Sequence, residues 1–308
     1  MNVTVFGAGG MGLYFAALLA RAGHRVTLVG RESTVAAAAA GPLTLTRGEA
    51  VVEISGVTVV SEVPPEPVDL VVVAVKAWQV TEAARALRPT VGPRTVVLPL
   101  QNGVEAAGEL VQVLGPRGVL GCSAVVIAKR TGPLAVACLG SDAALEIGPA
   151  TEGFGLPLGA TVDALTGAGI AVSVSDDIEA TLWRKLMLIS SYGGVGALAR
   201  QPVGVTSTDP HTHELVRAAM VEVLAVARAR GVRLGEADVD GMMKVFESFR
   251  PDTTSSMQRD LLAGRPSELE FQNGAVVRFG REVGVPTPIH RCVYASQLPG
   301  ELAARKEA

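Results

Sequence analysis

Three glycines near the start of the chain, Gly7, Gly9 and Gly12, restrict how this stretch can fold. They follow an apolar segment, residues 3–6, and precede a run rich in Ala and Leu. The spacing G-x-G-x-x-G between a strand and a helix is typical of dinucleotide-binding sites: the first glycine permits a tight turn, the second leaves room for a pyrophosphate, and the third lets the helix pack closely on the strand. The diphosphate would lie at the amino end of the helix, where free N–H groups favour negative charge.

The surrounding sequence supports this interpretation. A second apolar segment, residues 26–29, follows at the distance expected for a strand-helix-strand unit. The alternative is a purely structural turn, since a chain with 35 glycines contains such spacings by chance. We predict that the cofactor loop consists of Gly7, Ala8, Gly9, Gly10, Met11 and Gly12.

The residue after the second predicted strand indicates which cofactor the site prefers. An NAD-selective site carries Asp or Glu there to bind the ribose 2′-hydroxyl, whereas Arg suits a 2′-phosphate. This chain has Arg31, followed directly by Glu32. If Arg31 were merely a solvated surface residue, Glu32 would be the competing candidate. We expect NADP (NADPH), because Arg31 is the residue at the carboxyl edge of the strand.

Composition and charge exclude several classes of protein. A net charge of −3 gives no reason to expect nucleic acid or an anionic membrane surface as a partner. The apolar runs are too short to cross a bilayer, and the chain enters a strand at once, so we expect neither a membrane span nor a signal peptide. The 3 cysteines and 4 histidines show no disulfide or metal-ligand spacing; His211 and His213 come nearest to a metal pair. We therefore expect a cytoplasmic protein without a metal.

Apolar and alternating segments predict an α/β first half. Residues 69–75 and 95–100 are near-continuous apolar runs, typical of parallel strands buried on both faces, and a helix is predicted after each. Residues 35–40, 43–46 and 51–60 suggest small strands or a hairpin at the sheet edge. Further strands that extend the sheet in antiparallel fashion, a helix and a last strand are predicted at residues 120–128, 135–138, 144–148, 157–166 and 170–174.

Beyond residue 175 the strand patterns nearly vanish. Helices are predicted from residue 175 through 185 and at 214–230, 236–248 and 269–283, and the segment Glu301–Ala308 is expected to fray. We predict an α/β fold: a Rossmann-type doubly wound sheet followed by an all-helical C-terminal domain. The expected boundary gives an NADP-binding domain, residues 1–175, and a helical substrate and dimerisation domain, residues 176–308.

Two polar residues follow the buried parallel strands. Lys76 and Asn102 both come at carboxyl ends of strands, which is the edge where ligands bind in an open doubly wound sheet. For Asn102 with Gly103, the alternative is a plain turn. Lysine is scarce, since it accounts for 5 of the 27 Lys and Arg residues. A lysine kept where arginine is the rule is a candidate for proton transfer, because a guanidinium stays protonated.

The helical half offers a second set of candidates. They are Lys185, the segment Ser255-Ser256-Met257, and Glu268 with Asn273. A hydride acceptor needs groups that hold it and neutralise the developing alkoxide, and we expect these from the cleft between domains. Taken singly, each candidate has a structural alternative: a solvated helix lysine, a helix cap, and an ordinary carboxylate at a helix start.

Taken together, these segments resemble the ketopantoate reductases (2-dehydropantoate 2-reductases) nearly end to end. The matching pieces are the loop 7–12 with Arg31, residues 75–79, 101–103, 182–186 and 255–260, and Glu268 followed by Asn273-Gly274. The resemblance implies an enzyme, an NADP-dependent oxidoreductase acting on CH–OH groups. Such an enzyme uses NADPH to reduce 2-dehydropantoate to pantoate, a step toward pantothenate and coenzyme A.

The resemblance also implies roles for individual residues. Lys185 would act as the general acid at the ketone oxygen, and Glu268 would hold that lysine or the substrate hydroxyl. Ser256 would hydrogen-bond the substrate, while Asn102 and Lys76 would bridge cofactor and substrate. An ammonium near the reacting oxygen stabilises developing negative charge, which agrees with the role implied for Lys185.

The helix after Lys185 departs from the family pattern. The family usually presents asparagines four and eight residues after this lysine, and here those positions hold Ile189 and Gly193. Losing two amides changes what a site recognises, although Ser190, Ser191 and Tyr192 are candidates to compensate. Glu222 aligns less securely with a further acidic residue of the family.

Two alternatives to ketopantoate reduction therefore stay open. One is an NADPH-dependent reductase of the same fold acting on another, more apolar 2-keto acid. The other is a non-catalytic protein that senses NADP(H), which has no need of a proton donor such as Lys185. A homodimer is the default expectation for a symmetric enzyme of this kind.

Overall fold

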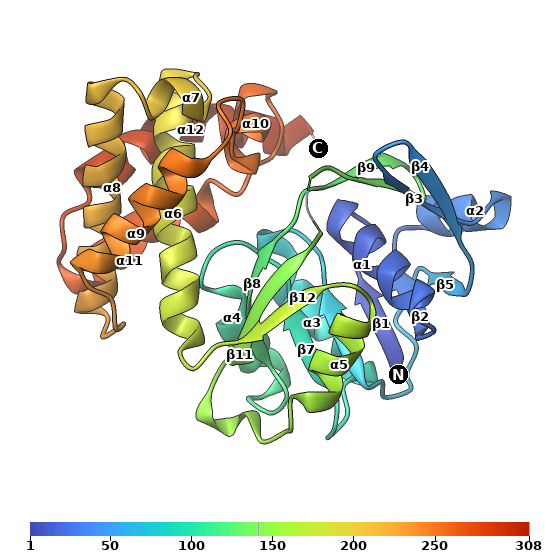
Figure 1. The fold of residues 1–308 in the computed structure, drawn as a ribbon. Helices are drawn as coiled ribbons and strands as arrows, with labels where there is room; N and C mark the ends of the chain where they lie inside the picture. Colours follow the sequence, from blue (N-terminus) through green and yellow to red (C-terminus); the bar gives the residue numbers. More distant parts are fainter. Residues whose placement is uncertain (141, 308) are drawn as a thin grey trace. The chain divides into compact units, whose positions relative to one another are not determined.

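The computed structural model describes residues 1–140 and 142–307, and the chain divides into two compact units (Figure 1). One unit comprises Met1–Gln101 and Glu105–Ile178. The other comprises Asn102–Val104 and the helical half of the chain from Glu179 onward. The short segment Asn102–Val104 thus packs with the helical half although both of its flanks belong to the first unit. No helix in the described part of the chain is long and apolar enough to cross a membrane.

The first unit is built on a parallel sheet with the strand order β5-β2-β1-β6-β7. Its strands are β1 (Asn2–Phe6), β2 (Arg25–Val29), β5 (Val57–Val60), β6 (Leu70–Val73) and β7 (Val96–Pro99). Every residue of β6 is fully buried, as the near-continuous apolar run predicts for a strand covered on both faces. The strand order reverses between β1 and β6, and the carboxyl ends of strands at such a reversal are where ligands bind in doubly wound sheets. The predicted Rossmann-type fold is confirmed.

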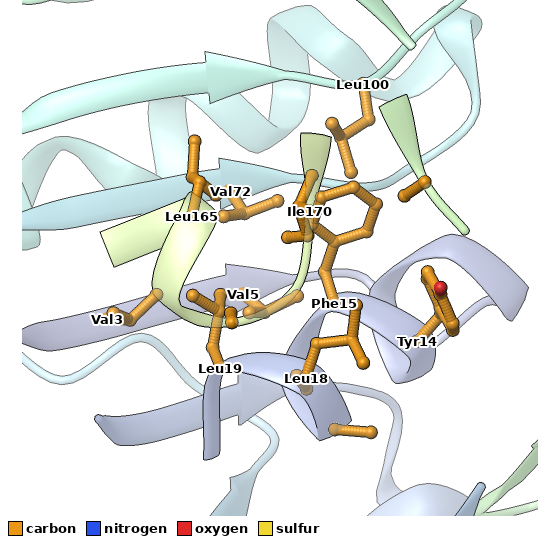
Figure 2. Packing of buried hydrophobic residues seen from close by; sticks show 14 of the residues in the cluster. Val3, Val5, Tyr14, Phe15, Leu18, Leu19, Val72, Leu100, Leu165 and Ile170 are labelled. Atoms are coloured by element: carbon orange, nitrogen blue, oxygen red, sulfur yellow. The ribbon is translucent and has the colours of Figure 1, made fainter. Parts of the chain in front are cut away.

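The first unit also contains several helices. They are α1 (Gly10–Arg21), α2 (Glu32–Ala40), α3 (Val80–Leu87), α4 (Ala106–Leu114) and α5 (Gly159–Gly167). Figure 2 shows Phe15, Leu18 and Leu19 of α1 among side chains of the strands, including Val5 and Val72. Each of these three side chains is fully buried, which stabilises the fold by about 1.5–3 kcal/mol per side chain. Burial of α1 therefore holds the glycine loop at its amino end in place.

Two smaller sheets correct the expected strand pairing. One has the order β4-β3-β10-β9 and the other β12-β11-β8. Their strands are β3 (Leu43–Arg47), β4 (Ala50–Ile54), β8 (Leu120–Val125), β9 (Ala128–Gly132), β10 (Ala135–Cys138), β11 (Ala144–Pro149) and β12 (Ala171–Val174). The expectation that all segments from 120 to 148 extend the main sheet is wrong, because β10 pairs with β3 and packs with it on α1. Residues 35–40 are helical rather than extended, since consecutive alanines favour a helix.

The second unit is helical, as predicted. Its elements are α6 (Ile178–Ala199), α7 (Val203–Thr206), α8 (Pro210–Ala229), α9 (Glu236–Ser248), α10 (Ser256–Leu262), the π-helical turn η4 (Glu270–Gly274), α11 (Ala275–Val283) and α12 (Pro288–Glu307). Trp183, Phe246 and Phe279 lie in its core. For residues 301–307 the expectation of fraying is wrong, because α12 continues through Glu307 and Glu301 is 3% exposed, whereas Ala308 lies outside the described residues.

Candidate active site

The glycine loop after β1 has the geometry that its spacing predicts. Gly7 has φ +111°, which L side chains rarely adopt. A Cβ at Gly12 would lie 1.7 Å from the carbonyl oxygen of Gly7, so the helix start can approach the turn because residue 12 has no side chain. A Cβ at Gly9 would meet no atom within 4 Å. The loop therefore combines a tight turn, an open cradle and close helix packing, which fits a bound dinucleotide.

Two further contacts shape this loop, and the spacing alone did not predict them. A Cβ at Gly10 would lie 2.4 Å from the carbonyl oxygen of Ala128, because β9 passes beside the start of α1. A Cβ at Gly30 would lie 3.0 Å from Cβ of Ala8, so the turn after β2 lies against the loop. Met11 is half-buried against the core of the unit. Arg31 therefore follows a residue that lies directly beside the loop.

Arg31 occupies the N-cap position of α2. Its carbonyl oxygen accepts a hydrogen bond from the Thr34 N–H at 2.7 Å, and its side chain is exposed. Glu32 lies in the first turn of the same helix, where the helix dipole favours a carboxylate. The competing residue Glu32 thus has a structural reason for its place, and the Arg31 guanidinium is accessible.

The carboxyl ends of β6 and β7 are tied together by Gln101. Its Nε2 donates hydrogen bonds to the carbonyl oxygens of Val73 at 3.0 Å and Val75 at 2.8 Å. Lys76 follows at once; its side chain is exposed, and its Nζ lies 5.8 Å from the ring centroid of Trp78. Lys76 thus lies just beyond the carboxyl end of β6, the strand that pairs with β1. This end of β6 is close to the glycine loop, because Gly7 packs against the backbone of Ala74.

Asn102 and Glu268 are 166 residues apart in sequence, and the fold brings them together. Nδ2 of Asn102 donates a hydrogen bond to Oε2 of Glu268 at 2.9 Å. Glu268 is 8% exposed, and buried polar groups of this kind are normally hydrogen-bonded. Gly103 has φ +95°, and a Cβ there would lie 2.9 Å from the carbonyl oxygen of Phe271, so the backbones approach closely at this point.

The segment just before Glu268 is anchored to α12. The Ser267 N–H and hydroxyl donate hydrogen bonds to the carboxylate of Glu301, the latter at 2.6 Å. Arg305 donates to the Glu301 carboxylate at 2.7 Å and to the Ser267 carbonyl at 2.9 Å. The C-terminal helix thus holds the residue next to Glu268, a role that no local sequence signal indicated.

Lys185, Ile189 and Gly193 share one face of α6. Lys185 and Ile189 are half-buried and Gly193 is buried. A Cβ at Gly193 would lie 2.5 Å from Oγ of Ser255, which also accepts a hydrogen bond from the Gln258 N–H at 3.0 Å and so caps α10. The helix-cap alternative is confirmed for Ser255. Ser256, the first residue of α10, is exposed.

Comparison with known proteins decides the family. The profile described as "Ketopantoate reductase PanE/ApbA" matches residues 3–152, and "Ketopantoate reductase PanE/ApbA C terminal" matches residues 177–297. A protein from Mycobacterium tuberculosis named 2-dehydropantoate 2-reductase is 34% identical over 293 residues, which cover 94% of each chain. The chain belongs to the ketopantoate reductase family.

Solved structures share the fold of this ketopantoate reductase family member. A PanE/ApbA family ketopantoate reductase from Ralstonia eutropha JMP134 is 32% identical, with a TM-score of 0.87, and the match covers 99% of this chain and 100% of that one. A D-mandelate dehydrogenase, solved with NADH and anilino(oxo)acetate, has a TM-score of 0.88 at 24% identity over 99% of both chains. At that identity the likeness shows a shared fold.

In this family member, the hydroxyl groups near Ile189 and Gly193 face the protein interior. Ser190 Oγ donates to the Leu186 carbonyl at 2.7 Å, and Ser191 Oγ is buried without a hydrogen-bond partner among the described residues. Tyr192 packs against Phe246 and Phe249, and burial raises the pKa of its hydroxyl to about 12. Ser190 therefore forms its hydrogen bond, and Tyr192 its ring contacts, inside the helical unit.

Glu222 has a structural role at the start of α12. Its carboxylate accepts hydrogen bonds from the N–H groups of Ile289 at 2.8 Å and His290 at 3.1 Å, and it lies 2.9 Å from Nδ1 of His290. Burial works against the charged form, but these hydrogen bonds outweigh it and hold the pKa of Glu222 below its usual range.

His211 and His213 lie in the first turn of α8, and His213 Nε2 lies 2.8 Å from Oε1 of Glu247. Among the described residues, no group of three or more His, Cys, Asp or Glu side chains is arranged to hold a metal ion. The His211-x-His213 spacing thus marks the polar start of a helix in the described structure.

Proposed function

We propose that this chain is an enzyme that reduces 2-dehydropantoate to pantoate with NADPH, in pantothenate and coenzyme A biosynthesis. Membership of a family of oxidoreductases supports the reaction class. The observation that carries the proposal is the hydrogen bond between Asn102 and the buried carboxylate of Glu268. Two residues from distant parts of the sequence, each proposed for the site on separate grounds, meet there.

The cofactor we propose is NADP rather than NAD. The loop Gly7–Gly12 would hold the pyrophosphate at the start of α1, and Arg31 would bind the 2′-phosphate with its planar guanidinium. Lys76 and Asn102 would bridge cofactor and substrate. The open space above Gly9 and the accessible side chain of Arg31 support these assignments. When bound, NADPH supplies the hydride that reduces the ketone carbon.

We propose Lys185 as the residue that donates a proton to the substrate. Its ammonium would give a proton to the ketone oxygen and stabilise the negative charge that develops there. Glu268, oriented by Asn102, would hold that lysine or the substrate hydroxyl, and Ser256 would hydrogen-bond the substrate. A single protonatable amine suits this role, because an arginine at the same place would not release its proton.

The same proposal assigns residues 1–175 to cofactor binding and residues 176–308 to substrate binding and dimerisation. The enzyme would act as a homodimer in the cytoplasm. Closed symmetric dimers are the commonest soluble oligomers, which supports the dimer.

A second candidate is a reductase of another, more apolar 2-keto acid. Ile189 presents a branched alkyl side chain one turn after Lys185, and Ser255 fills the space at Gly193. A site wall without amides pairs poorly with a substrate hydroxyl, and such losses change specificity by orders of magnitude. Fold likeness to a D-mandelate dehydrogenase is compatible with this candidate.

NADPH oxidation, followed by absorbance, distinguishes these functions. Ketopantoate is compared with a panel of branched and linear 2-keto acids at matched concentrations. Preferential oxidation with ketopantoate is the expected result, whereas preference for an apolar acid would favour the second candidate. Tight NADPH binding without oxidation by any acceptor would favour an NADP(H)-sensing protein instead.

A further inference from the structure

A buried junction ties the segment that carries Glu268 to the helix that carries Lys185. Asn273 is 1% exposed, and its Nδ2 donates a hydrogen bond to the Ser190 carbonyl oxygen at 3.0 Å. Asn273 lies 5 residues after Glu268, and Ser190 lies 5 residues after Lys185. All four residues belong to the helical unit. One turn of α6 therefore separates this hydrogen bond from Lys185, and the start of η4 separates it from Glu268.

The backbone around Asn273 is shaped for this contact. Asn273 lies in the π-helical turn η4, and such wide turns are frequent at functional sites. On α6, a Cβ at Gly194 would lie 2.7 Å from Nδ2 of Asn273, so a side chain there would push the amide away from Ser190. Oδ1 of Asn273 is buried and has no hydrogen-bond partner among the described residues. The turn thus keeps the hydrogen bond from Asn273 to Ser190 although it leaves one buried oxygen of the same amide unsatisfied, which is unfavourable.

Ser190 is held from a second side as well. Its Oγ lies 3.2 Å from Nε2 of His290, whose Nδ1 lies 2.9 Å from Glu222. The side chains of Ser190 and His290 are fully buried, so neither is open to a substrate, and Glu222 is 9% exposed. A serine hydroxyl bonded to the carbonyl oxygen four residues earlier, as here to Leu186, tends to bend a helix. The contacts of Ser190 therefore shape α6 just after Lys185.

We propose that Asn273 is a positioning residue: through Ser190 it sets the register between the Glu268 segment and the part of α6 that carries Lys185. This inference rests on the roles proposed above for Lys185 and Glu268. Asn273 itself acts without touching substrate or cofactor. Its loss displaces the proton-transfer groups and leaves the glycine loop, which belongs to the other unit, unchanged.

Asn273→Ala, with Gln272→Ala as its matched control, tests the inference by kinetics. Gln272 is also 1% exposed, lies in the same π-helical turn, and has a buried Oε1 without a partner among the described residues. We expect Asn273→Ala to lower kcat about 10- to 100-fold with the 2-keto acid that the wild type prefers, at unchanged KM for NADPH, because small misplacements of reacting groups cost rate steeply. Gln272→Ala should lower Tm to a similar degree and leave kcat near the wild-type value. Equal losses of kcat in the two variants would overturn the proposal.

Gly194→Ala approaches the same contact from α6. The new methyl group meets Nδ2 of Asn273, so we expect the kcat loss seen in Asn273→Ala. The double variant should lose no more activity than either single variant, since both changes remove one interaction. Independent, additive losses would contradict the inference.

A readout without turnover separates this inference from the proposed function. The chain has 5 lysines, so NMR of the protein with ¹³C-methylated lysines gives a small set of signals, and Lys185→Arg identifies the one from Lys185. We expect this signal to shift in Asn273→Ala and to stay in place in Gln272→Ala. A signal that stays in place in both would overturn the positioning role. A wild-type protein that oxidises NADPH with no 2-keto acid would reject the proposed function, and the NMR comparison would still decide the role of Asn273.

Discussion

Lys185 is the side chain on which the proposed chemistry depends most. If it is the general acid, Lys185→Ala should lower kcat by about 10²–10⁴-fold, the usual contribution of a positioned proton donor. NADPH affinity should stay nearly unchanged, because the glycine loop lies in the other unit. Steady-state kinetics and a fluorescence titration of NADPH measure the two quantities. Lys244→Ala, which removes an exposed lysine from α9, is the control, and a Lys185→Ala enzyme with near-normal turnover would rule out the acid role.

Arg31 decides the choice between NADP and NAD in this proposal. Hydrogen bonds to a charged group contribute about 1.5–3 kcal/mol, so Arg31→Ala should weaken NADPH binding about 10- to 100-fold. NADH lacks the 2′-phosphate, and its affinity should hardly change. Isothermal titration with both nucleotides tests this, with Arg25→Ala at the opposite end of β2 as the control. Equal losses for the two nucleotides would contradict the assignment.

At the scale of one element, the glycine loop allows binding and folding to be separated. Gly9 has φ −79°, which alanine adopts without strain, and a Cβ there meets no other atom, so Gly9→Ala should change the free energy of unfolding by less than about 1 kcal/mol. The added methyl group would occupy the cradle and lower NADPH affinity on the order of tenfold or more.

In contrast to Gly9→Ala, Gly12→Ala should lower the stability of the fold. Its Cβ would lie 1.7 Å from a backbone oxygen, and overpacking of this kind costs about 1–3 kcal/mol or more. We expect a clear fall in Tm for Gly12→Ala and none for Gly9→Ala, measured by thermal unfolding without cofactor. If both variants unfolded like the wild type and bound NADPH normally, the loop would not be the cofactor site.

At the scale of the whole molecule, the buried pair of Glu222 and His290 links pH to stability. The pKa of Glu222 is lowered in the folded state, so its contribution to stability is fully present above the ordinary glutamate value of about 4.3 and is lost as the pH falls below it. Glu222→Gln lacks this titration. The free energy of unfolding should therefore fall less steeply for Glu222→Gln than for the wild type between about pH 5 and about pH 3.

Denaturant unfolding at a series of pH values measures this difference in slope. The matched control is Glu282→Gln, because the carboxylate of Glu282 is paired with Arg230 at an exposed position. That control should retain the wild-type slope, and a Glu222→Gln slope equal to it would contradict the role of Glu222 as a charge buried in the fold.

Several features of this protein follow from local sequence. The spacing of Gly7, Gly9 and Gly12 between apolar segments predicts a strand, a turn and a helix, because backbone sterics and burial periodicity act over a few residues. The same reasoning predicts the buried strand β6 and the helices of the second unit. It also indicates Lys76 and Asn102 at strand ends, since parallel strands expose their carboxyl ends at one edge.

Tertiary structure alone decided which distant groups meet. Local sequence patterns do not predict that β10 pairs with β3, that Asn102 forms a hydrogen bond with Glu268, or that Ser255 fills the space at Gly193. The C-terminal segment is expected to fray, yet Glu301 is buried, and Ser267 and Arg305 satisfy its carboxylate. Such contacts depend on packing between segments far apart in the chain, so the sequence determined the elements and the chemistry available, and the fold determined which side chains can act together.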